Sequence, residues 1–487
     1  MGRGIRRKAM VIAVGAILLA PFVAHAEEKE DARMQGLEDR MRSLEDRLVA
    51  SEATVQAQRE LLASQPTPDV AQGGGLDSFL SGLVWGGWVE ASYIYNFKDP
   101  DFNRFSQTHF QFNQNNNSFV LDGIKLELGK PASEPGTAGF QIDLLYGENA
   151  SILKNSDVIH GSSDDLVSDV TDSGIFIQEA YVSYNYDGVE IKFGKFETLL
   201  GYEVLDAPYN PHITHSELFF GAIPLFHTGI LASGDYGEEW TWAVGVVNGW
   251  NNSIDFNEDK GVLARIGWAN ESTSLTFNTF IGKEGLRSSE SRGVFSRGDL
   301  VCSNGGPGTS IGDPNGLDAG DCFGDSSDWT YVFDLVATYT ATDQLDLYGE
   351  FVYGMQEIGS QAGLTFPFGA TGPSAGVTDD PEWTAVMVGA VYDVNEKTTL
   401  ALRGEWFNDD GNFRLGHGPL LTGESDHYSA TATLGRQLTD NLTARAEYRY
   451  DVVNGSSGTD DSVFFNGSGS LSKRQSMGIL EVNYTFD

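Results

Sequence analysis

Residues 194–229 hold the densest group of side chains that could act on a polar solute, in the sequence GKFETLLGYEVLDAPYNPHITHSELFFGAIPLFHTG. Its carboxylates and imidazoles are Glu197, Glu203, Asp206, His212, His215, Glu217 and His227. Carboxylates gathered in one segment can attract cations, and imidazoles can carry protons or bind metals. Because three prolines interrupt the segment, we expect it to depart from regular secondary structure.

His212-x-x-His215, with Glu217 close by, could hold a divalent metal ion. However, two histidines three residues apart in a loop more often serve as hydrogen-bond partners, and the sequence defines neither a helix nor a third ligand. We therefore predict no metal and no other cofactor. Gly308–Gly312 matches the nucleophile motif G-x-S-x-G, but that motif needs a strand-to-helix turn, and here it lies in a Gly/Asp-rich stretch. Since no other nucleophile and base can be paired, we predict that the protein is not an enzyme.

The elements that must position this segment follow a predicted export signal, residues 1–26. Four basic residues precede the apolar run AMVIAVGAILLAPFVA, which ends in the cleavage-site pattern Ala24-His25-Ala26. This arrangement is typical of a secretory signal peptide. A retained anchor is the weaker alternative, because the run is shorter than the roughly 20 apolar residues that span a bilayer.

The two cysteines, Cys302 and Cys322, lie in one Gly/Asp-rich stretch. In an exported protein they predict a disulfide that closes a loop, which requires an oxidising compartment. A zinc site is the poorer interpretation, because the two sulfurs lack nearby histidines.

Residues 27–64 show a helical pattern, in which Met and Leu recur at the a and d positions of a heptad. The tetrad Leu-Glu-Asp-Arg at 37–40 recurs at 44–47, which places charges where parallel helices can pair them. We predict a parallel coiled-coil stalk; the alternative is a single surface helix, which has no need of a strict seven-residue repeat. The Pro/Gly-rich residues 65–82 predict a linker before a domain spanning 83–487.

Alternating polar and apolar residues recur from residue 83 onwards and predict sixteen strands. We expect them near 83–97, 118–130, 139–147, 175–187, 188–196, 226–234, 240–250, 261–270, 273–284, 329–342, 345–356, 383–394, 398–407, 427–438, 441–454 and 474–486. Short, turn-like links alternate with long loops. This predicts an all-β fold, a transmembrane antiparallel up-and-down β-barrel with turns at one rim and loops at the other. A soluble sandwich has no reason to segregate its loops in this way.

The two faces of these strands differ in polarity, and the charged face would point into the barrel. The predicted inward wall residues are Glu90, Asp143, Glu179, Lys192, Asp334, Glu350, Arg403, Glu405, Arg445, Glu447 and Arg449. Aromatic residues near strand ends would form girdles at the membrane surfaces: Tyr93, Tyr95, Trp240, Trp242, Trp383 and Trp406. The last strand, ILEVNYTFD, is predicted to close the barrel beside the first, with Leu480, Val482, Tyr484 and Phe486 facing lipid.

The segment 194–229 also resembles the signature of a known family, the type 2, OmpL-like β-barrel porins of Gram-negative outer membranes. The matching residues are Gly194-Lys195-Phe196, Leu200-Gly201-Tyr202-Glu203, Asn210-Pro211, Ser216, Phe219-Phe220, Pro224 and His227-Thr228-Gly229. The resemblance runs from about residue 83 to the C-terminus. It implies a general diffusion porin whose loop returns towards the lumen, and it identifies no solute.

We expect this loop to fold into the barrel, because it contains too many Leu and Phe residues to extend freely into water. One hypothesis is that its carboxylates line one side of a pore constriction, opposite Lys192, Arg403, Arg445 and Arg449 on the wall. The alternative is that these charges pair among themselves as part of the wall structure. The sequence leaves both open.

Composition and charge narrow the function. The chain has 69 acidic and 31 basic residues and a formal net charge of −38, which argues against nucleic acid as a partner. Because acidic walls and loops enrich cations, we predict passive, weakly cation-selective diffusion of small hydrophilic solutes and ions. The alternative is an envelope-tethering protein, whose coiled coil binds peptidoglycan and whose barrel is mainly an anchor.

The predicted location is the outer membrane of a Gram-negative bacterium, with the stalk in the periplasm. The expected partners are outer-membrane lipid and further copies of the chain, in a homotrimer formed through the coiled coil and the barrel walls. Peptidoglycan is a candidate partner for the stalk.

Overall fold

The computed structural model describes residues 82–100, 112–156, 174–255, 259–284, 329–357, 380–410, 413–415, 424–455, 462–467 and 470–486, and the backbone of 301–302 and 364–365. The chain divides into two units, Met1–Asp77 and Ser78–Asp487, and every described residue belongs to the second. The predicted signal peptide and coiled-coil stalk therefore lie outside the described residues. So do the side chains of Cys302 and Cys322, with their predicted disulfide.

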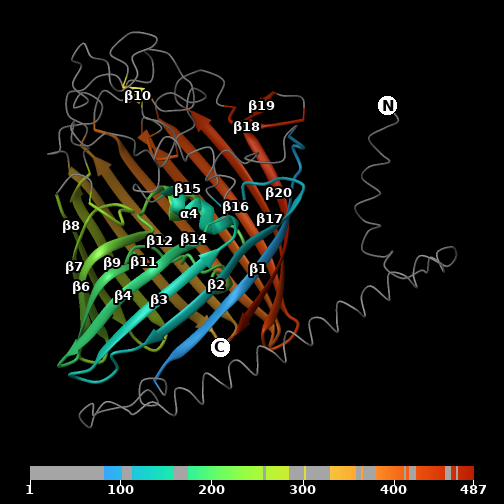
Figure 1. The fold of residues 1–487 in the computed structure, drawn as a ribbon. Coiled ribbons are helices and arrows are strands. Elements are labelled where there is room, and N and C mark those ends of the chain that lie inside the picture. Colours follow the sequence, from blue (N-terminus) through green and yellow to red (C-terminus); the bar gives the residue numbers. More distant parts are fainter. Residues whose placement is uncertain are drawn as a thin grey trace, which may run out of the picture. The chain divides into compact units, whose positions relative to one another are not determined.

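Within the described residues, sixteen antiparallel strands form one closed barrel, as the alternation predicts (Figure 1). They are β1 (Val84–Asn96), β2 (Ser118–Lys130), β3 (Ala138–Tyr146), β4 (Phe176–Tyr186), β5 (Val189–Glu197), β6 (Phe226–Tyr236), β7 (Trp240–Val247), β8 (Gly261–Ala269), β9 (Thr273–Lys283), β11 (Trp329–Thr342), β12 (Leu345–Gln356), β14 (Glu382–Asn395), β15 (Thr398–Asp409), β16 (Ser425–Gln437), β17 (Leu442–Gly455) and β20 (Arg474–Phe486). β20 pairs with β1, so the prediction of the closing strand is confirmed.

Shorter elements lie in the long connections. β10 (Val301–Cys302) pairs with β13 (Leu364–Thr365), and β18 (Phe464–Phe465) pairs with β19 (Leu471–Ser472). Helical turns are α4 (Glu148–Ser156), η1 (Ala207–Tyr209) and α5 (Glu217–Gly221). In the part of the chain that the structure describes, no helix has the length and apolar character needed to span a membrane.

The connections are segregated between the two rims. The turn rim holds the start of β1, the end of β20 and short links such as 187–188 and 343–344. Long connections such as 284–328 start and end at the opposite rim, called the loop rim. Asp187 and Gly188 have φ angles of 50° and 87°, and two left-handed residues are what a tight hairpin turn requires. The sequence chemistry of the turns thus fixes which strands are neighbours.

Burial shows that each strand has two unlike faces. On β17, Arg449 is 0% exposed, whereas its neighbour Tyr448 is 50% exposed. On β20, Glu481 is buried and both Leu480 and Val482 are exposed. Charged side chains therefore face the lumen and apolar ones face outwards, as expected for a barrel in lipid.

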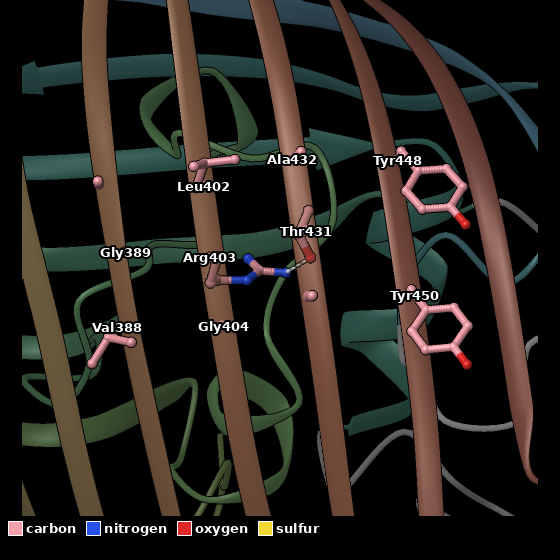
Figure 2. Close-up of a pocket in the computed structure, with 11 residues that line it drawn as sticks. Val388, Gly389, Leu402, Arg403, Gly404, Thr431, Ala432, Tyr448 and Tyr450 are labelled. Carbon is pink, nitrogen blue, oxygen red and sulfur yellow. Dashed lines mark hydrogen bonds between the residues drawn. The ribbon is translucent and has the colours of Figure 1, made fainter.

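The outer face carries a hollow of about 510 Å³ across β14–β17 (Figure 2). It lies where Gly404 and Ala430 bring no large side chain to the wall, beside Leu402 and Tyr450. The guanidinium of Arg403 is instead directed towards Thr431, with Nη2 3.4 Å from Oγ1 (Figure 2). A single layer of strands therefore separates an apolar outer surface from a charged inner one.

The prediction that Trp383 belongs to an aromatic girdle is wrong. Its side chain is 1% exposed, and Nε1 donates to the carbonyl oxygen of Ala222 inside the barrel at 3.0 Å. Arg414 lies over the Trp383 ring, 4.9 Å from the centroid. An aromatic residue at a strand end can face either lipid or the lumen. Trp383 faces the lumen because it has the same parity on β14 as the buried residues Ala385 and Met387.

Candidate functional site

Residues 198–225, which connect β5 to β6, form the lumen loop. The β5–β6 ladder continues as far as the pair Glu197 and Phe226, so the loop is shorter than the segment 194–229. Glu197 and His227 therefore belong to strands. The remaining predicted loop residues, Glu203, Asp206, His212, His215 and Glu217, all lie on the lumen loop and all are buried.

Apolar side chains explain why the lumen loop stays inside. Leu200, Leu218, Phe219 and Leu225 are buried in one cluster with inward residues of the wall. Each such burial stabilises the fold by about 1.5–3 kcal/mol. Ser216 caps the short helix α5, because its Oγ accepts a hydrogen bond from the Phe219 backbone N–H at 3.0 Å.

The first part of the lumen loop is attached to β11 and β12. Asp334 Oδ2 accepts the Gly201 N–H at 2.8 Å, and Glu350 Oε2 accepts the Tyr202 N–H at 2.9 Å. The ring of Tyr202 stacks on that of Tyr348 with centroids 4.2 Å apart. Two wall carboxylates predicted to face solutes thus hold backbone amides of the loop.

The middle of the lumen loop is held by four residues of β15 and β17, Arg403, Arg445, Glu447 and Arg449, which we call the loop clamp. Glu447 accepts the Ile213 and Thr214 N–H groups at 2.6 and 3.1 Å, and the Thr214 hydroxyl at 2.5 Å.

The three arginines of the clamp donate to loop carbonyl groups. Arg403 donates to Thr214 O, Arg445 to Asn210 O and Arg449 to His215 O, each at 2.7 Å. Charged groups thus satisfy loop backbone groups that would otherwise be buried without partners.

A carboxylate of the loop, Glu203, and a carboxylate of the wall, Glu405, both pair with Arg403. Glu203 Oε1 lies 2.6 Å from Arg403 Nη1, and Glu203 Oε2 accepts the Ser216 N–H at 2.9 Å. Glu405 Oε1 lies 2.9 Å from Arg403 Nε, and its Oε2 accepts the Glu217 N–H at 2.8 Å. Removing one member of such a buried pair typically costs about 3–5 kcal/mol.

Asp206 attaches the lumen loop to β1, β2 and β4, and β2 lies opposite β11 in the sixteen-stranded closed barrel. Its carboxylate lies 2.5 Å from Lys125 Nζ and accepts hydrogen bonds from Trp88 Nε1 and Gln178 Nε2, both at 3.2 Å. Lys125 also pairs with Asp143 at 3.0 Å and with Glu127 at 3.1 Å. The lumen loop therefore crosses the barrel from β11 and β12, at Gly201 and Tyr202, to β1–β4, at Asp206.

The histidines serve as hydrogen-bonding groups. His212 Nδ1 lies 2.7 Å from Thr433 Oγ1 and Nε2 lies 3.0 Å from Tyr348 Oη, while His215 Nε2 lies 2.8 Å from Val204 O. Burial, followed by the three clamp arginines, holds the pKa of His212 well below its usual range, so its ring is neutral at pH 7. Among the described residues, no three His, Cys, Asp or Glu side chains form a metal-binding group.

Burial raises the pKa of Glu217 well above the ordinary glutamate range, against the lowering effect of Arg449. Glu217 Oε2 lies 3.4 Å from His427 Nδ1. A protonated carboxyl can donate to a neutral imidazole nitrogen, which accounts for a buried acid beside a buried histidine.

The predicted wall residues all occupy inward positions. Glu90, Asp143, Asp334, Glu350, Arg403, Glu405, Arg445, Glu447 and Arg449 are buried, while Glu179 and Lys192 are partly exposed. Sequence analysis missed Glu127, which has the same inward parity as Lys125 on β2. The alternation in IKLELG contained that signal, because Leu126 and Leu128 are the outward residues.

A family model described as "Putative beta-barrel porin-2, OmpL-like" matches residues 82–486. The chain belongs to this family. The fold is similar to that of solved outer-membrane proteins at low identity. An anion-selective porin from Comamonas acidovorans is 11% identical, with a TM-score of 0.51, over 83% of this chain and 99% of that one. The outer membrane channel DcaP of Acinetobacter baumannii is 14% identical, with a TM-score of 0.50, over 86% of this chain and 100% of that one.

A search of curated proteins found no match. Membership of the OmpL-like porin family and the closed barrel support a porin function and an outer-membrane location. They favour a channel over an enzyme. The solved structures contribute the fold alone, because all are below 25% identity.

Proposed function

We propose that this porin allows passive diffusion of small hydrophilic solutes and ions, and that the lumen loop limits their size. The observation that carries the proposal is the pair of bonds from the loop to opposite sides of the barrel, from Asp206 to Lys125 on β2 and from the Gly201 N–H to Asp334 on β11, eight strands away of sixteen. A loop held at two opposite walls narrows the water-filled cross-section, so small solutes pass and large ones do not.

Weak cation selectivity belongs to the same proposal. The net charge of −38 and the predominance of carboxylates among inward residues support it, because a negative surface potential enriches cations. Of the two hypotheses for the charged groups, the short distances from Glu203 to Arg403 and from Asp206 to Lys125 favour mutual pairing. In this proposal the loop carboxylates position the loop more than they contact solutes.

The proposed arrangement places the turn rim in the periplasm, since outer-membrane barrels keep short turns on that side. In this proposal the signal peptide (1–26) is removed. The stalk (27–64) and linker (65–82) then lie in the periplasm, and the barrel (83–487) lies in the outer membrane. The assembly is a homotrimer in lipid. The heptads and the porin family support this choice.

Single-channel recording in planar bilayers tests the function, with the full mature chain and with a variant lacking residues 27–64. Both should conduct, and liposomes containing either should swell in small sugars but not in large ones. If neither conducts while the stalk co-sediments with peptidoglycan, the envelope-tethering alternative replaces this proposal.

A further inference from the structure

The basic residues predicted to face solutes differ in their accessibility. Arg403, Arg445 and Arg449 are buried, and each donates to a carbonyl group of the lumen loop. Each also pairs with a wall carboxylate, for example Arg449 Nε with Asp451 Oδ1 at 2.8 Å. Their charges are neutralised locally, so a passing ion is screened from them.

Lys192 has a different environment. It lies on β5 between the outward residues Ile191 and Phe193, so its side chain faces the lumen. The Lys192 side chain is 23% exposed. Its ion-pair partner is Glu190, whose Oε2 lies 3.7 Å from Lys192 Nζ and whose side chain is 36% exposed. The ammonium group also lies over the Tyr181 ring, 4.5 Å from the centroid. These contacts are made to the wall, and both members of the ion pair are open to water.

Lys192 lies on the same inner wall as a row of carboxylates, because it is opposite Ser183 on β4, four residues along that strand from Glu179. Glu127 pairs directly across the sheet with Asp143, and Asp143 with Glu179, which forms a row of three carboxylates on β2, β3 and β4. Like charges in directly opposed positions repel each other. Lys125 forms ion pairs with Glu127 and Asp143 of this row as well as with Asp206, but its side chain is buried and is therefore not open to water as that of Lys192 is.

We propose that Lys192 is the residue that sets the ion selectivity of this pore, by weakening the attraction of the acidic wall for cations. The inference rests on the proposed porin function and names the residue that tunes it. The ligand class is small inorganic ions. The clamp arginines position the lumen loop, whereas Lys192 is a basic group of the inner wall that stays open to a permeating ion.

The test is the reversal potential in a KCl gradient for Lys192→Gln and, as a second uncharged variant, Lys192→Met. Both should raise the cation-to-anion permeability ratio roughly twofold to threefold at 0.1 M salt, and less at 1 M, where the Debye length falls to about 3 Å. Glu190→Gln should shift the ratio in the opposite direction. Lys397→Gln, the same charge change in an exposed turn, should shift it little.

The outcomes separate the two proposals. An unchanged ratio in both conducting Lys192 variants overturns the assignment of Lys192 and leaves the porin function standing. A shift of equal size in Lys397→Gln also overturns it, because the effect would then reflect net charge alone. Absence of conductance in the unmodified protein overturns the porin function itself.

Discussion

Glu447 accepts three hydrogen bonds from the lumen loop, from two backbone N–H groups and one hydroxyl. Glu447→Gln keeps the shape but replaces a charged acceptor by a neutral one and brings in an NH₂ group. We expect the free energy of unfolding to fall by about 1.5–3 kcal/mol, because a hydrogen bond to a charged group contributes this much to stability. Thermal unfolding in detergent should show a lower midpoint, and single-channel traces should become noisier as the loop loosens.

The matched control for Glu447→Gln is Glu396→Gln, in an exposed turn at the turn rim. It should leave both the midpoint and the noise unchanged. A Glu447→Gln protein as stable and as quiet as the unmodified one would contradict the role of the loop clamp.

Glu217 should make the stability of the folded protein depend on pH. Its folded-state pKa is raised by burial, so the folded state keeps a proton that the unfolded state releases above about pH 4.3. The stabilising contribution is therefore present at low pH and is lost as the pH rises towards the folded pKa.

Glu217→Gln should remove this dependence. Between pH 5 and pH 8, the unfolding midpoint of the unmodified protein should fall relative to that of the variant. Glu238→Gln, at an exposed turn, serves as the control and should track the unmodified protein. Parallel pH profiles for Glu217→Gln and the unmodified protein would show that Glu217 is ionised in the folded state.

At the scale of elements, the lumen loop is the part that limits solute size in our proposal. Replacing residues 203–222 with a short Gly/Ser linker removes the bonds to β1–β4 and to the loop clamp while retaining the Glu197–Phe226 ladder pair. We expect a larger conductance, and liposome swelling with sugars that the unmodified protein excludes.

Glu203→Gln is the control for this replacement, because it removes one ion pair without removing the loop. It should leave the size limit in place. An unchanged size limit after replacement of the loop would mean that another part of the chain sets it.

At the scale of the whole molecule, closure depends on β1 and β20. The Phe486 ring lies 6.3 Å from that of Trp85 by centroid distance, next to the pair Gly87 and Phe486. Phe486→Ala removes an aromatic contact worth about 0.5–1.5 kcal/mol beyond its buried area. We expect less heat-resistant folded barrel in membranes, measured by gel mobility with and without boiling.

Val482→Ala, on the same strand and also facing outwards, is the control for Phe486→Ala and should have a smaller effect. Equal losses in the two variants would indicate that lipid-facing area in general, rather than the terminal aromatic residue, determines closure. Asp487 lies outside the described residues, and deleting it is predicted to leave function intact.

The barrel was predictable from sequence because strand parity and link length are local properties. The alternation in β17, from Leu442 to Tyr450, is enough to identify its inward charges, and the same holds for β20. The links at 187–188 and 343–344 identified the turn rim. A period of two and a short turn are encoded within a few residues, so they need no long-range information.

What the charges do was decided only by the tertiary structure. Glu203 and Arg403 are 200 residues apart in sequence, and no local pattern brings them to 2.6 Å. The hydrogen-bond partner of Trp383, the Ala222 carbonyl oxygen, likewise comes from the lumen loop, 161 residues away in sequence. Sequence determined which side chains face inwards, because parity is local. The fold decided which of them are neutralised and which, like Lys192, remain open to water, because pairing depends on segments that meet across the lumen.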